Sequence, residues 1–489
     1  MSAAQATPAK FDFKRLFFLF LGLFLFAVVY YSPPWPDAVD PMGKIFALPT
    51  EGKAALALFL LAGTWWVFEV LPIGVTGLTI GVVQALFFIR PASAAFKDFM
   101  DPSVLFIFGS LMIGAVFTKV GITKRLAYKM LMIVGERTSM IYLGCFVVTA
   151  LLTHVMAHTA VAATMYPLLL SIYALYEGGD KPTKFGKGLF IGMAFVAGAG
   201  SIITLLGAAR GIVALGFYQE ITGNEISFFE LSYYMAPIGW LMVFLLWLLI
   251  MIFLKPEKAV MPGLRDKAKQ LSAEMGPFSR NEILASAIIF GVIFFLSLQS
   301  FIPALAEFNK AAVLLVSTVL FFIFKILDIR DLEDVPWNII LLFAGAMSMG
   351  FCLWQTGAAE WLAINWLGFF QEAHWFIFVI AIAFFVMIMT NFIMNVAAIA
   401  ISVPVALVVA PYLGVAPEVI VFAALVTAGM PFLLLVGAAP NAIAYNSRQF
   451  TSGEFFAYGI PASILLMALV ALAVLLVWPL LGMPVLAPQ

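Results

Sequence analysis

The chain has 489 residues, of which 64% are hydrophobic and only 11% are charged. This composition excludes an ordinary soluble globular protein, because soluble domains carry about 25% charged residues. The formal net charge is zero, which argues against nucleic acid as a partner. Cys145 and Cys352 both lie in apolar segments, so no disulfide framework is predicted.

Apolar segments long enough to cross a bilayer recur along the chain, and we predict about ten or eleven helical spans. Examples are 16–31, 54–68, 73–89, 233–254, 283–298, 311–327 and 456–478. The first span is followed by Ser32-Pro33-Pro34-Trp35 rather than by a small-residue cleavage site, so we expect a retained helix. The predicted fold class is an all-α polytopic membrane protein.

The placement of basic residues predicts the orientation in a plasma (inner) membrane. We place the N-terminus in the cytoplasm and let segments 139–171 and 374–410 each enter and leave on one side. Most of the 26 Lys and Arg residues then face the cytoplasm, as the positive-inside rule requires. The C-terminus falls outside, and Arg210 is left within the membrane.

One polar segment occurs in both halves of the chain. Residues 153–167 superpose on 390–404 at an offset of 237, which aligns Thr153 with Thr390 and His158 with Asn395. Shorter blocks match at nearly the same offset: 108–112 with 343–347, 121–127 with 357–363, and 207–211 with 437–441. Five predicted spans separate the copies, and this odd number predicts an inverted-topology repeat. Chance similarity among apolar helices is the alternative.

The repeated segments have a predicted chemistry. A hairpin that ends inside the bilayer exposes helix-terminal N–H and C=O groups, which need partners there. Helix N-termini favour anions, whereas unwound carbonyls suit Na⁺. Segments 198–211 and 429–441, rich in glycine and small residues, are predicted to be helices broken at the same depth. Two hairpin tips and two breaks together predict one anion held between two cation sites.

These features resemble the divalent anion:Na⁺ symporter family, the carriers of dicarboxylates, citrate and sulfate. The resemblance covers nearly the whole chain, including 105–109, 121–127, Gly459-Ile460-Pro461, both hairpins and both breaks. It implies eleven spans plus two re-entrant hairpins, a homodimer, and a transport part that moves like an elevator against a scaffold. The implied division is scaffold 1–138, first transport half 139–231, loop and second scaffold 232–373, and second transport half with the last helix 374–489.

The chain departs from the family signatures. The family has Ser-Asn-Thr at each hairpin tip, but here the tips read Ala157-His158-Thr159 and Met394-Asn395-Val396. The family's breaks carry Thr-Pro-Pro-Asn or similar, but here they read Ala208-Ala209-Arg210-Gly211 and Ala438-Ala439-Pro440-Asn441. The resemblance implies substrate contacts from His158, Thr159, Arg210, Asn395, Pro440 and Asn441. It implies Na⁺ contacts from Thr153, Ala157, Gly198, Thr390, Ile393 and Asn395, with the second Na⁺ site more intact than the first.

Arg210 is the sharpest departure, because an arginine near the bilayer centre costs at least ~2.5–3.5 kcal/mol and needs a partner. Its guanidinium could hold a substrate carboxylate or sulfonate bidentately. It could instead stand in for a missing Na⁺, or it could snorkel or bond to carbonyls of the break.

His154 and His158 are four residues apart and would share a face if that stretch were helical. Proton coupling, a hydrogen bond from His158 to substrate and a structural role all stay open. The absence of a carboxylate or thiol nearby in sequence argues against a metal.

The predicted function is secondary active transport of a small dianion coupled to Na⁺, with no enzymatic role and no cofactor. A dianion entering a negative interior faces ~4.6 kcal/mol at ~100 mV, so two cations must neutralise it and a third is needed to use the potential. The alternatives are an H⁺-coupled or exchanging oxyanion carrier, an ion antiporter of the same superfamily, or a non-transporting membrane subunit. The predicted partners are the anion, Na⁺, membrane lipid and a second copy of the chain.

Overall fold

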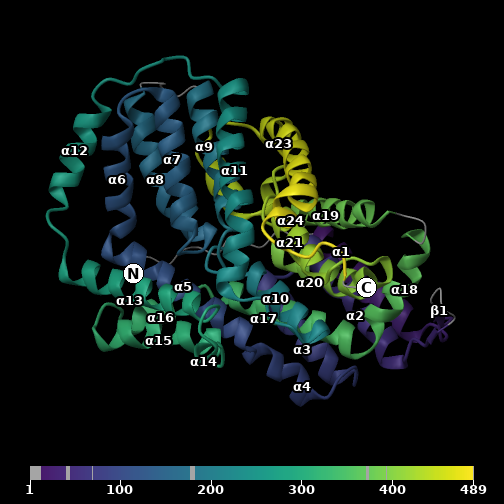
Figure 1. Ribbon diagram of the computed structural model, residues 1–489. Helices are drawn as coiled ribbons and strands as arrows, with labels where there is room; N and C mark the ends of the chain where they lie inside the picture. Colours follow the sequence, from purple (N-terminus) through teal and green to yellow (C-terminus); the bar gives the residue numbers. More distant parts are fainter. Residues whose placement is uncertain are drawn as a thin grey trace.

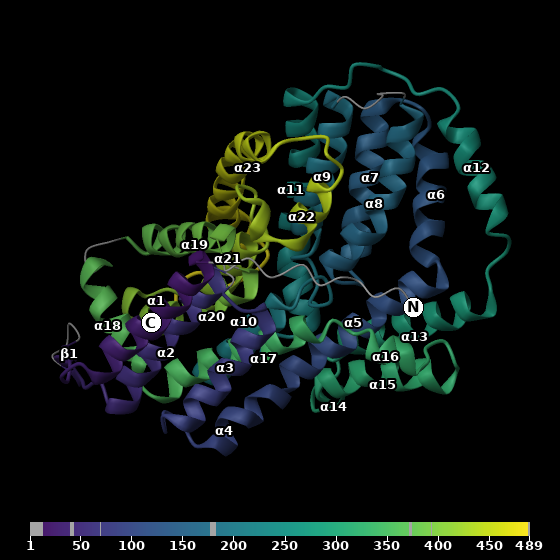
Figure 2. The same cartoon turned by 180° about the vertical axis from the view of Figure 1, so that it is seen from behind.

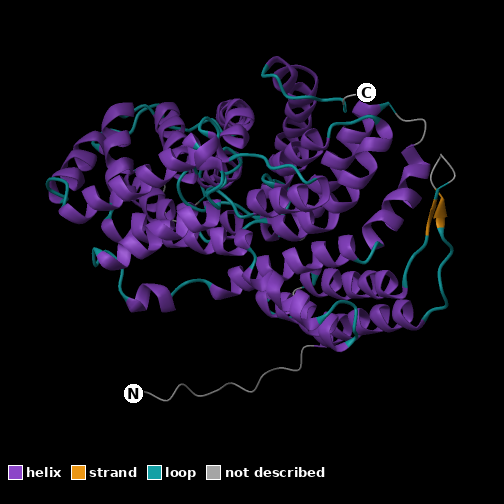
Figure 3. Cartoon of the chain, turned by 60° about the horizontal axis from the view of Figure 1, so that its bottom comes forward, coloured by secondary structure: helices purple, strands orange, loops and turns teal. Residues whose placement is uncertain are grey.

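The computed structural model describes residues 13–39, 44–68, 70–176, 182–370, 374–392 and 394–487, and these residues are mainly helical (Figures 1 and 3). Within these ranges, nine helical segments are long and apolar enough to span a membrane, and four shorter apolar helices accompany them. A small antiparallel pair joins β1 (Ala38–Val39) to β2 (Ile45–Phe46). The prediction of an all-α polytopic membrane protein is confirmed.

The helices follow one another along the whole chain. The first quarter contains α1 (Phe13–Tyr31), α2 (Thr50–Val67), α3 (Ile73–Leu86), α4 (Ala92–Lys97), η1 (Asp98–Met100), α5 (Pro102–Val120) and α6 (Ile122–Val134). Next come α7 (Thr138–Thr153), α8 (His158–Leu175), α9 (Lys184–Gly200), α10 (Arg210–Thr222), α11 (Phe228–Phe253) and α12 (Leu264–Glu274). The third quarter contains α13 (Arg280–Leu298), α14 (Pro303–Ala306), α15 (Lys310–Ile323), α16 (Ile329–Glu333), α17 (Trp337–Gln355) and α18 (Ala358–Phe370). The last contains α19 (Trp375–Phe392), α20 (Asn395–Val409), η2 (Ala410–Leu413), α21 (Pro417–Ala428), η3 (Leu435–Gly437), α22 (Ala439–Tyr445), α23 (Ser452–Leu472), the π-helical turn η4 (Ala473–Val477) and α24 (Trp478–Leu480).

Capping boxes set the start of several long helices. Before α11, the Ser227 hydroxyl accepts from the Glu230 N–H and the Glu230 carboxylate accepts from the Ser227 N–H. Ser279 and Glu282 do the same before α13, and a third box precedes α23. The spans predicted for these helices begin a few residues too late, because hydropathy ignores a polar first turn.

Both predicted hairpins coincide with pairs of consecutive helices. α7 ends at Thr153 and α8 begins at His158, while α19 ends at Phe392 and α20 begins at Asn395. The two predicted helix breaks are also confirmed, between α9 and α10 and between α21 and α22. All four interruptions therefore fall where small and polar residues enter otherwise apolar segments.

The two halves pack on each other reciprocally. Helix α10 of the first half contacts α20 and α21 of the second, and α22 of the second half contacts α8 and α9 of the first. Figure 2 shows α22 beside α9. Within each half, equivalent pairs also touch, α7 with α9 and α19 with α21. This exchange brings the four interruptions together at one place.

A buried polar network fixes α3 and α4 against α17. The Arg90 guanidinium donates to Asp98 Oδ2 at 2.7 Å and to Gln84 Oε1 at 3.1 Å. Gln84 Nε2 in turn donates to Ser348 Oγ at 2.8 Å. Arg90 and Asp98 are both more than nine-tenths buried, so neither charge has water as an alternative partner.

Replacing Asp98 by alanine is expected to lower the free energy of unfolding by about 3–5 kcal/mol, because it leaves the Arg90 charge buried without its carboxylate. Thermal unfolding of the purified protein in detergent measures the loss. Asp334→Ala, at an exposed position in the loop before α17, is the control and should change stability by less than about 0.5 kcal/mol. Equal behaviour of the two variants would show that the ion pair contributes nothing.

Candidate functional site

A cavity of about 290 Å³ lies where the four interruptions meet. The first hairpin contributes Ala157, His158, Thr159, Ala160 and Ala163, and the second contributes Met394, Asn395 and Val396. The first break contributes Leu205, Leu206, Ala208, Ala209 and Arg210, and the second contributes Ala438 and Ala439. Segments separated by more than two hundred residues therefore surround one space, as the repeat predicted.

The other walls come from α5 and from the start of α17. They are Phe106, Ile107, Ser110 and Leu111 on one side and Pro336, Ile339 and Phe343 on the other. Ser110 Oγ donates to the Leu206 carbonyl at 3.1 Å, which ties the first break to α5. Most of this lining is apolar, and Arg210 is the one charged residue among the described residues that line the cavity. A charge in such surroundings interacts strongly with an opposite charge, because little water screens it.

Three helices of at least 13 residues begin at the cavity. α8 starts at His158, α20 at Asn395 and α10 at Arg210. The N-terminal ends of helices carry partial positive charge and unpaired N–H groups, which stabilise anions. Together with the Arg210 guanidinium, these ends make the cavity electropositive.

The Arg210 side chain is only 2% exposed. Its Nη2 donates to Ser201 Oγ at 2.8 Å, whereas Nη1 is buried and has no hydrogen-bond partner. A Cβ added to Gly429 would lie 2.6 Å from Nη2, so the guanidinium rests against this glycine. Ser201 and Gly429 cap the C-termini of α9 and α21, so the cation lies between two carbonyl ends. Because the Arg210 side chain is buried among these helix ends, it does not snorkel to the membrane surface.

The stretch from His154 to His158 is not helical, so the two histidines do not share a helix face. His154 caps the C-terminus of α7, and a turn separates it from α8. His154 Nδ1 lies 2.6 Å from the Ala150 carbonyl, and its ring packs against Trp240. His158 lines the cavity, and its backbone N–H donates to the Gly207 carbonyl at 3.0 Å while Nδ1 lies 3.3 Å from the same oxygen.

Three oxygen atoms converge in the second half, behind the cavity. Thr390 Oγ1 donates to the Ala428 carbonyl at 3.0 Å and lies 3.4 Å from Asn395 Oδ1. Thr390 is fully buried and Asn395 is 7% exposed. The carbonyl ends of α19 and α21 meet here, and oxygens at helix C-termini suit a cation such as Na⁺.

The oxygens near the hairpin tip of the first half are engaged in other hydrogen bonds. Thr153 Oγ1 donates to the Ala150 carbonyl of its own helix at 2.6 Å. The His154 carbonyl accepts from Thr204 Oγ1 at 2.7 Å, and the Gly207 carbonyl accepts from the His158 N–H. The two halves are therefore alike in backbone but unequal in chemistry.

Several predicted site residues do not line the cavity. Asn441 Nδ2 donates to the Pro431 and Leu434 carbonyls at 2.8 and 3.1 Å, so this side chain and Pro440 shape the second break from behind. Gly198 is inside α9, and its carbonyl accepts from Ser201 Oγ at 2.7 Å. The predicted Na⁺ ligand Ile393 lies outside the described residues.

The sequence analysis assigned no site role to Ser201, Thr204 and Gly207 in the first break or to Asn391 in the second hairpin. Asn391 Oδ1 accepts from the backbone N–H groups of Leu433 and Leu434 at 2.8 and 3.2 Å. The sequence carries a signal for Ser201, Thr204 and Asn391, because each is a polar residue in an apolar segment, where polar groups need partners.

Replacing Asn391 by alanine is expected to lower the free energy of unfolding by about 2–4 kcal/mol, because it leaves two backbone N–H groups of a half-buried loop without an acceptor. Asn365→Ala is the matched control. The side-chain amides of Asn391 and Asn365 each donate to the carbonyl four residues earlier in the helix, but Asn365 is exposed and accepts no hydrogen bond from a loop. Thermal unfolding distinguishes them, and a loss no larger than that of the control would contradict this role.

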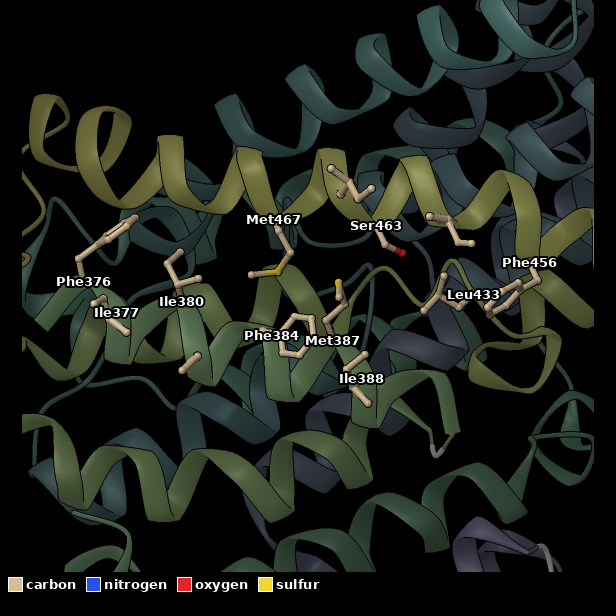
Figure 4. Close-up of a pocket in the computed structure, with 13 residues that line it drawn as sticks. Phe376, Ile377, Ile380, Phe384, Met387, Ile388, Leu433, Phe456, Ser463 and Met467 are labelled. Carbon is tan, nitrogen blue, oxygen red and sulfur yellow. The ribbon is translucent and has the colours of Figure 1, made fainter. Parts of the chain in front are cut away.

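A larger groove of about 690 Å³ lies between α19 and α23 (Figure 4). Ile380, Phe384 and Ile388 of α19 face Ser463 and Met467 of α23 in this view. No charged residue is present among the described residues that line it. This surface suits hydrocarbon and not an anion, so the smaller cavity at the interruptions is the candidate site.

A polytopic helical protein with a small electropositive cavity between broken membrane helices is typical of membrane transport proteins. The profile of the sodium:sulfate symporter transmembrane region matches residues 25–484, so the chain belongs to this family. The resemblance to the divalent anion:Na⁺ symporters is thereby confirmed.

Two curated relatives are sodium-dependent dicarboxylate transporters named SdcS. The chain is 25% identical to that of Staphylococcus saprophyticus over 465 residues, covering 90% of this chain and 89% of the relative. It is 25% identical to that of Staphylococcus aureus over 494 residues, covering 96% of this chain and 92% of the relative.

Among solved structures, MtrF of Neisseria gonorrhoeae has a TM-score of 0.59 at 14% identity, covering 97% of this chain and 96% of MtrF. The YdaH transporter of Alcanivorax borkumensis has a TM-score of 0.57 at 12% identity, covering 98% and 100%. At such identities these structures support the fold alone.

Proposed function

We propose that this protein is a secondary carrier that moves a small dianion, a dicarboxylate, sulfate or sulfonate, across the plasma (inner) membrane with Na⁺. The observation that carries the proposal is the cavity enclosed by both hairpin tips and both helix breaks, with a buried Arg210 guanidinium that has no acidic partner among the residues the structure describes. The cavity volume of about 290 Å³ favours small anions over larger ones.

The side chains have distinct proposed roles. The positive charge of Arg210 and the N-terminal ends of α8, α10 and α20 attract the negative charges of the substrate. His158, Thr159 and Asn395 complete the contact from the two tips. Na⁺ is held in the second half by Thr390, Asn395 and the Ala428 carbonyl. In the H⁺-coupled alternative, His158 carries the proton, and a strong response of transport to pH between 6 and 8 would favour it.

The mechanism is proposed to be alternating access of the elevator type. The reciprocal contacts of α10 with α20 and of α22 with α8 support an inverted repeat whose two halves move together as one transport part. The family resemblance supports the proposed division at residues 139, 232 and 374 and the proposed homodimer. The placement of basic residues supports a cytoplasmic N-terminus and an external C-terminus.

Thermal-shift measurements on the purified protein test the proposal. Sulfate, succinate and ethanedisulfonate, all dianions at neutral pH, are each titrated with NaCl and with choline chloride, and acetate is the singly charged control. A bound ligand raises the apparent unfolding temperature in proportion to the logarithm of its concentration. We expect at least one dianion to stabilise the protein, and more strongly with Na⁺. No shift with any anion in either salt would refute an anion carrier.

A further inference from the structure

The candidate cavity has two chemically different parts. The polar residues among the described residues that line it are Ser110, His158, Thr159, Arg210 and Asn395, and all except Ser110 belong to the hairpin tips or to the first break. The walls from α5 and α17 are otherwise apolar, with the side chains of Phe106, Ile107, Leu111, Ile339 and Phe343. The cavity therefore combines a polar, positively charged part with an extended hydrocarbon surface.

The polar side chains of the cavity are partly engaged within the protein. Ser110 Oγ donates to a backbone carbonyl of the first break at 3.1 Å, and His158 Nδ1 lies 3.3 Å from another carbonyl of the same break. Asn395 Oδ1 lies 3.4 Å from the Thr390 hydroxyl. Among the described lining residues from α5 and α17, Ser110 has the one side chain that can form hydrogen bonds. A hydroxyl group of a substrate that lay against these walls would lose its hydrogen bonds to water without replacement, which is unfavourable.

The volume of the cavity exceeds what the smallest dianions fill. About 290 Å³ corresponds to about ten water molecules at ~30 Å³ each, and a sulfate ion would occupy only a small part of this space. Water in the remaining part would lie against side chains that offer it no hydrogen bonds. A ligand whose own carbon groups fill that part displaces the poorly bound water and buries apolar surface against Phe106, Ile339 and Phe343.

We propose that the preferred substrates are dicarboxylates whose carbon backbone carries alkyl groups, and that sulfate and hydroxylated dicarboxylates bind weakly. The carboxylates lie toward the hairpin tips and Arg210, and the alkyl groups lie against the walls from α5 and α17. This inference rests on the proposed function and specifies the substrate class of the same cavity. Each buried methyl group strengthens binding about fourfold, whereas a hydroxyl group in the same place weakens it.

Two dianions of matched shape test the inference. The meso forms of 2,3-dimethylsuccinate and tartrate carry two methyl groups or two hydroxyl groups on the same succinate backbone, and both are dianions at pH 8. Dissociation constants for these two anions, for succinate and for sulfate are obtained from thermal shifts of the purified full-length protein in NaCl. We expect dimethylsuccinate to bind about tenfold more tightly than succinate and about thirtyfold or more tightly than tartrate.

A variant of one wall residue assigns the preference to this cavity. Ile339→Thr shortens a side chain of the α17 wall and gives it a hydroxyl group, so the ratio of dimethylsuccinate affinity to tartrate affinity should fall by about tenfold. Ile323→Thr makes the same change at an exposed position at the end of α15, and this matched control should keep the wild-type ratio.

The outcomes are separable. Tartrate or sulfate binding as tightly as dimethylsuccinate to the wild-type protein would overturn the inference while leaving the dianion carrier intact. An affinity ratio in Ile339→Thr equal to that of the wild-type protein would also overturn it. Absence of a thermal shift with every dianion, in NaCl and in choline chloride, would defeat the proposed function, and the inference with it.

Discussion

Arg210→Gln is expected to weaken dianion binding by about thirtyfold or more. A buried charge that pairs with a ligand accounts for about 2–5 kcal/mol when it is removed. Arg210 is the one charged residue among the described residues that line the cavity, so no neighbour replaces it. Loss of the dianion-induced thermal shift, or of labelled-anion binding, measures the effect.

The same variant should make the anion-free protein more stable, which separates a binding role from a structural one. Wild-type Arg210 is 2% exposed, and its Nη1 is unpaired, so the folded state carries an uncompensated charge that Gln lacks. A glutamine still offers a polar group toward Ser201. Arg330→Gln, at an exposed position in α16, is the control and should leave both the unfolding temperature and the dianion-induced shift unchanged. A strongly destabilised variant would instead assign Arg210 to the architecture.

Thr390→Val is expected to lower the apparent affinity for Na⁺ by about ten- to a hundredfold. The substitution keeps the shape of the side chain but removes one of three converging oxygens, and a polar contact to a charge contributes about 1.5–3 kcal/mol. A Na⁺ titration of the thermal shift at saturating dianion gives the affinity.

Two further valine variants sharpen this measurement. Thr427→Val is the matched control, because its equally buried hydroxyl bonds only to the Ala423 and Ala424 carbonyls of its own helix. Thr153→Val examines the first half. If only the second half binds Na⁺, Thr153→Val should leave the Na⁺ affinity as unchanged as Thr427→Val does. A loss of Na⁺ affinity as large as that of Thr390→Val would establish two working cation sites.

The breaks in the helices could be predicted from sequence because their cause is local. Gly, Pro and isolated polar residues interrupt apolar segments, and a repeat at one offset marks the same interruptions twice. The turn at 154–157 and the start of α20 at Asn395 follow from this pattern. The identity of the side chains at the cavity was only partly accessible: His158, Thr159, Arg210 and Asn395 line it, but Pro440 and Asn441 do not.

The rest depends on contacts between distant segments, which hydropathy and spacing do not encode. Nothing local indicates that Ser201 receives a hydrogen bond from Arg210, or that Asn391 supports the backbone of Leu433 and Leu434. The apolar walls from α5 and α17 were likewise not identified as part of the site, because an apolar residue in an apolar span gives no signal of its own. Side-chain partners were therefore not predicted where tertiary packing selects them.

The crossing of α10 onto α20 and of α22 onto α8 has a consequence for the integrity of the protein. Neither the N-terminal nor the C-terminal portion encloses the cavity alone, since each supplies a short helix that covers the other. Fragments made by cutting the chain near residue 265 would each expose an apolar face meant for the missing piece. These fragments should form the ligand cavity only after they associate again. In the intact protein, the continuous polypeptide keeps the two portions at the high local concentration that this association needs.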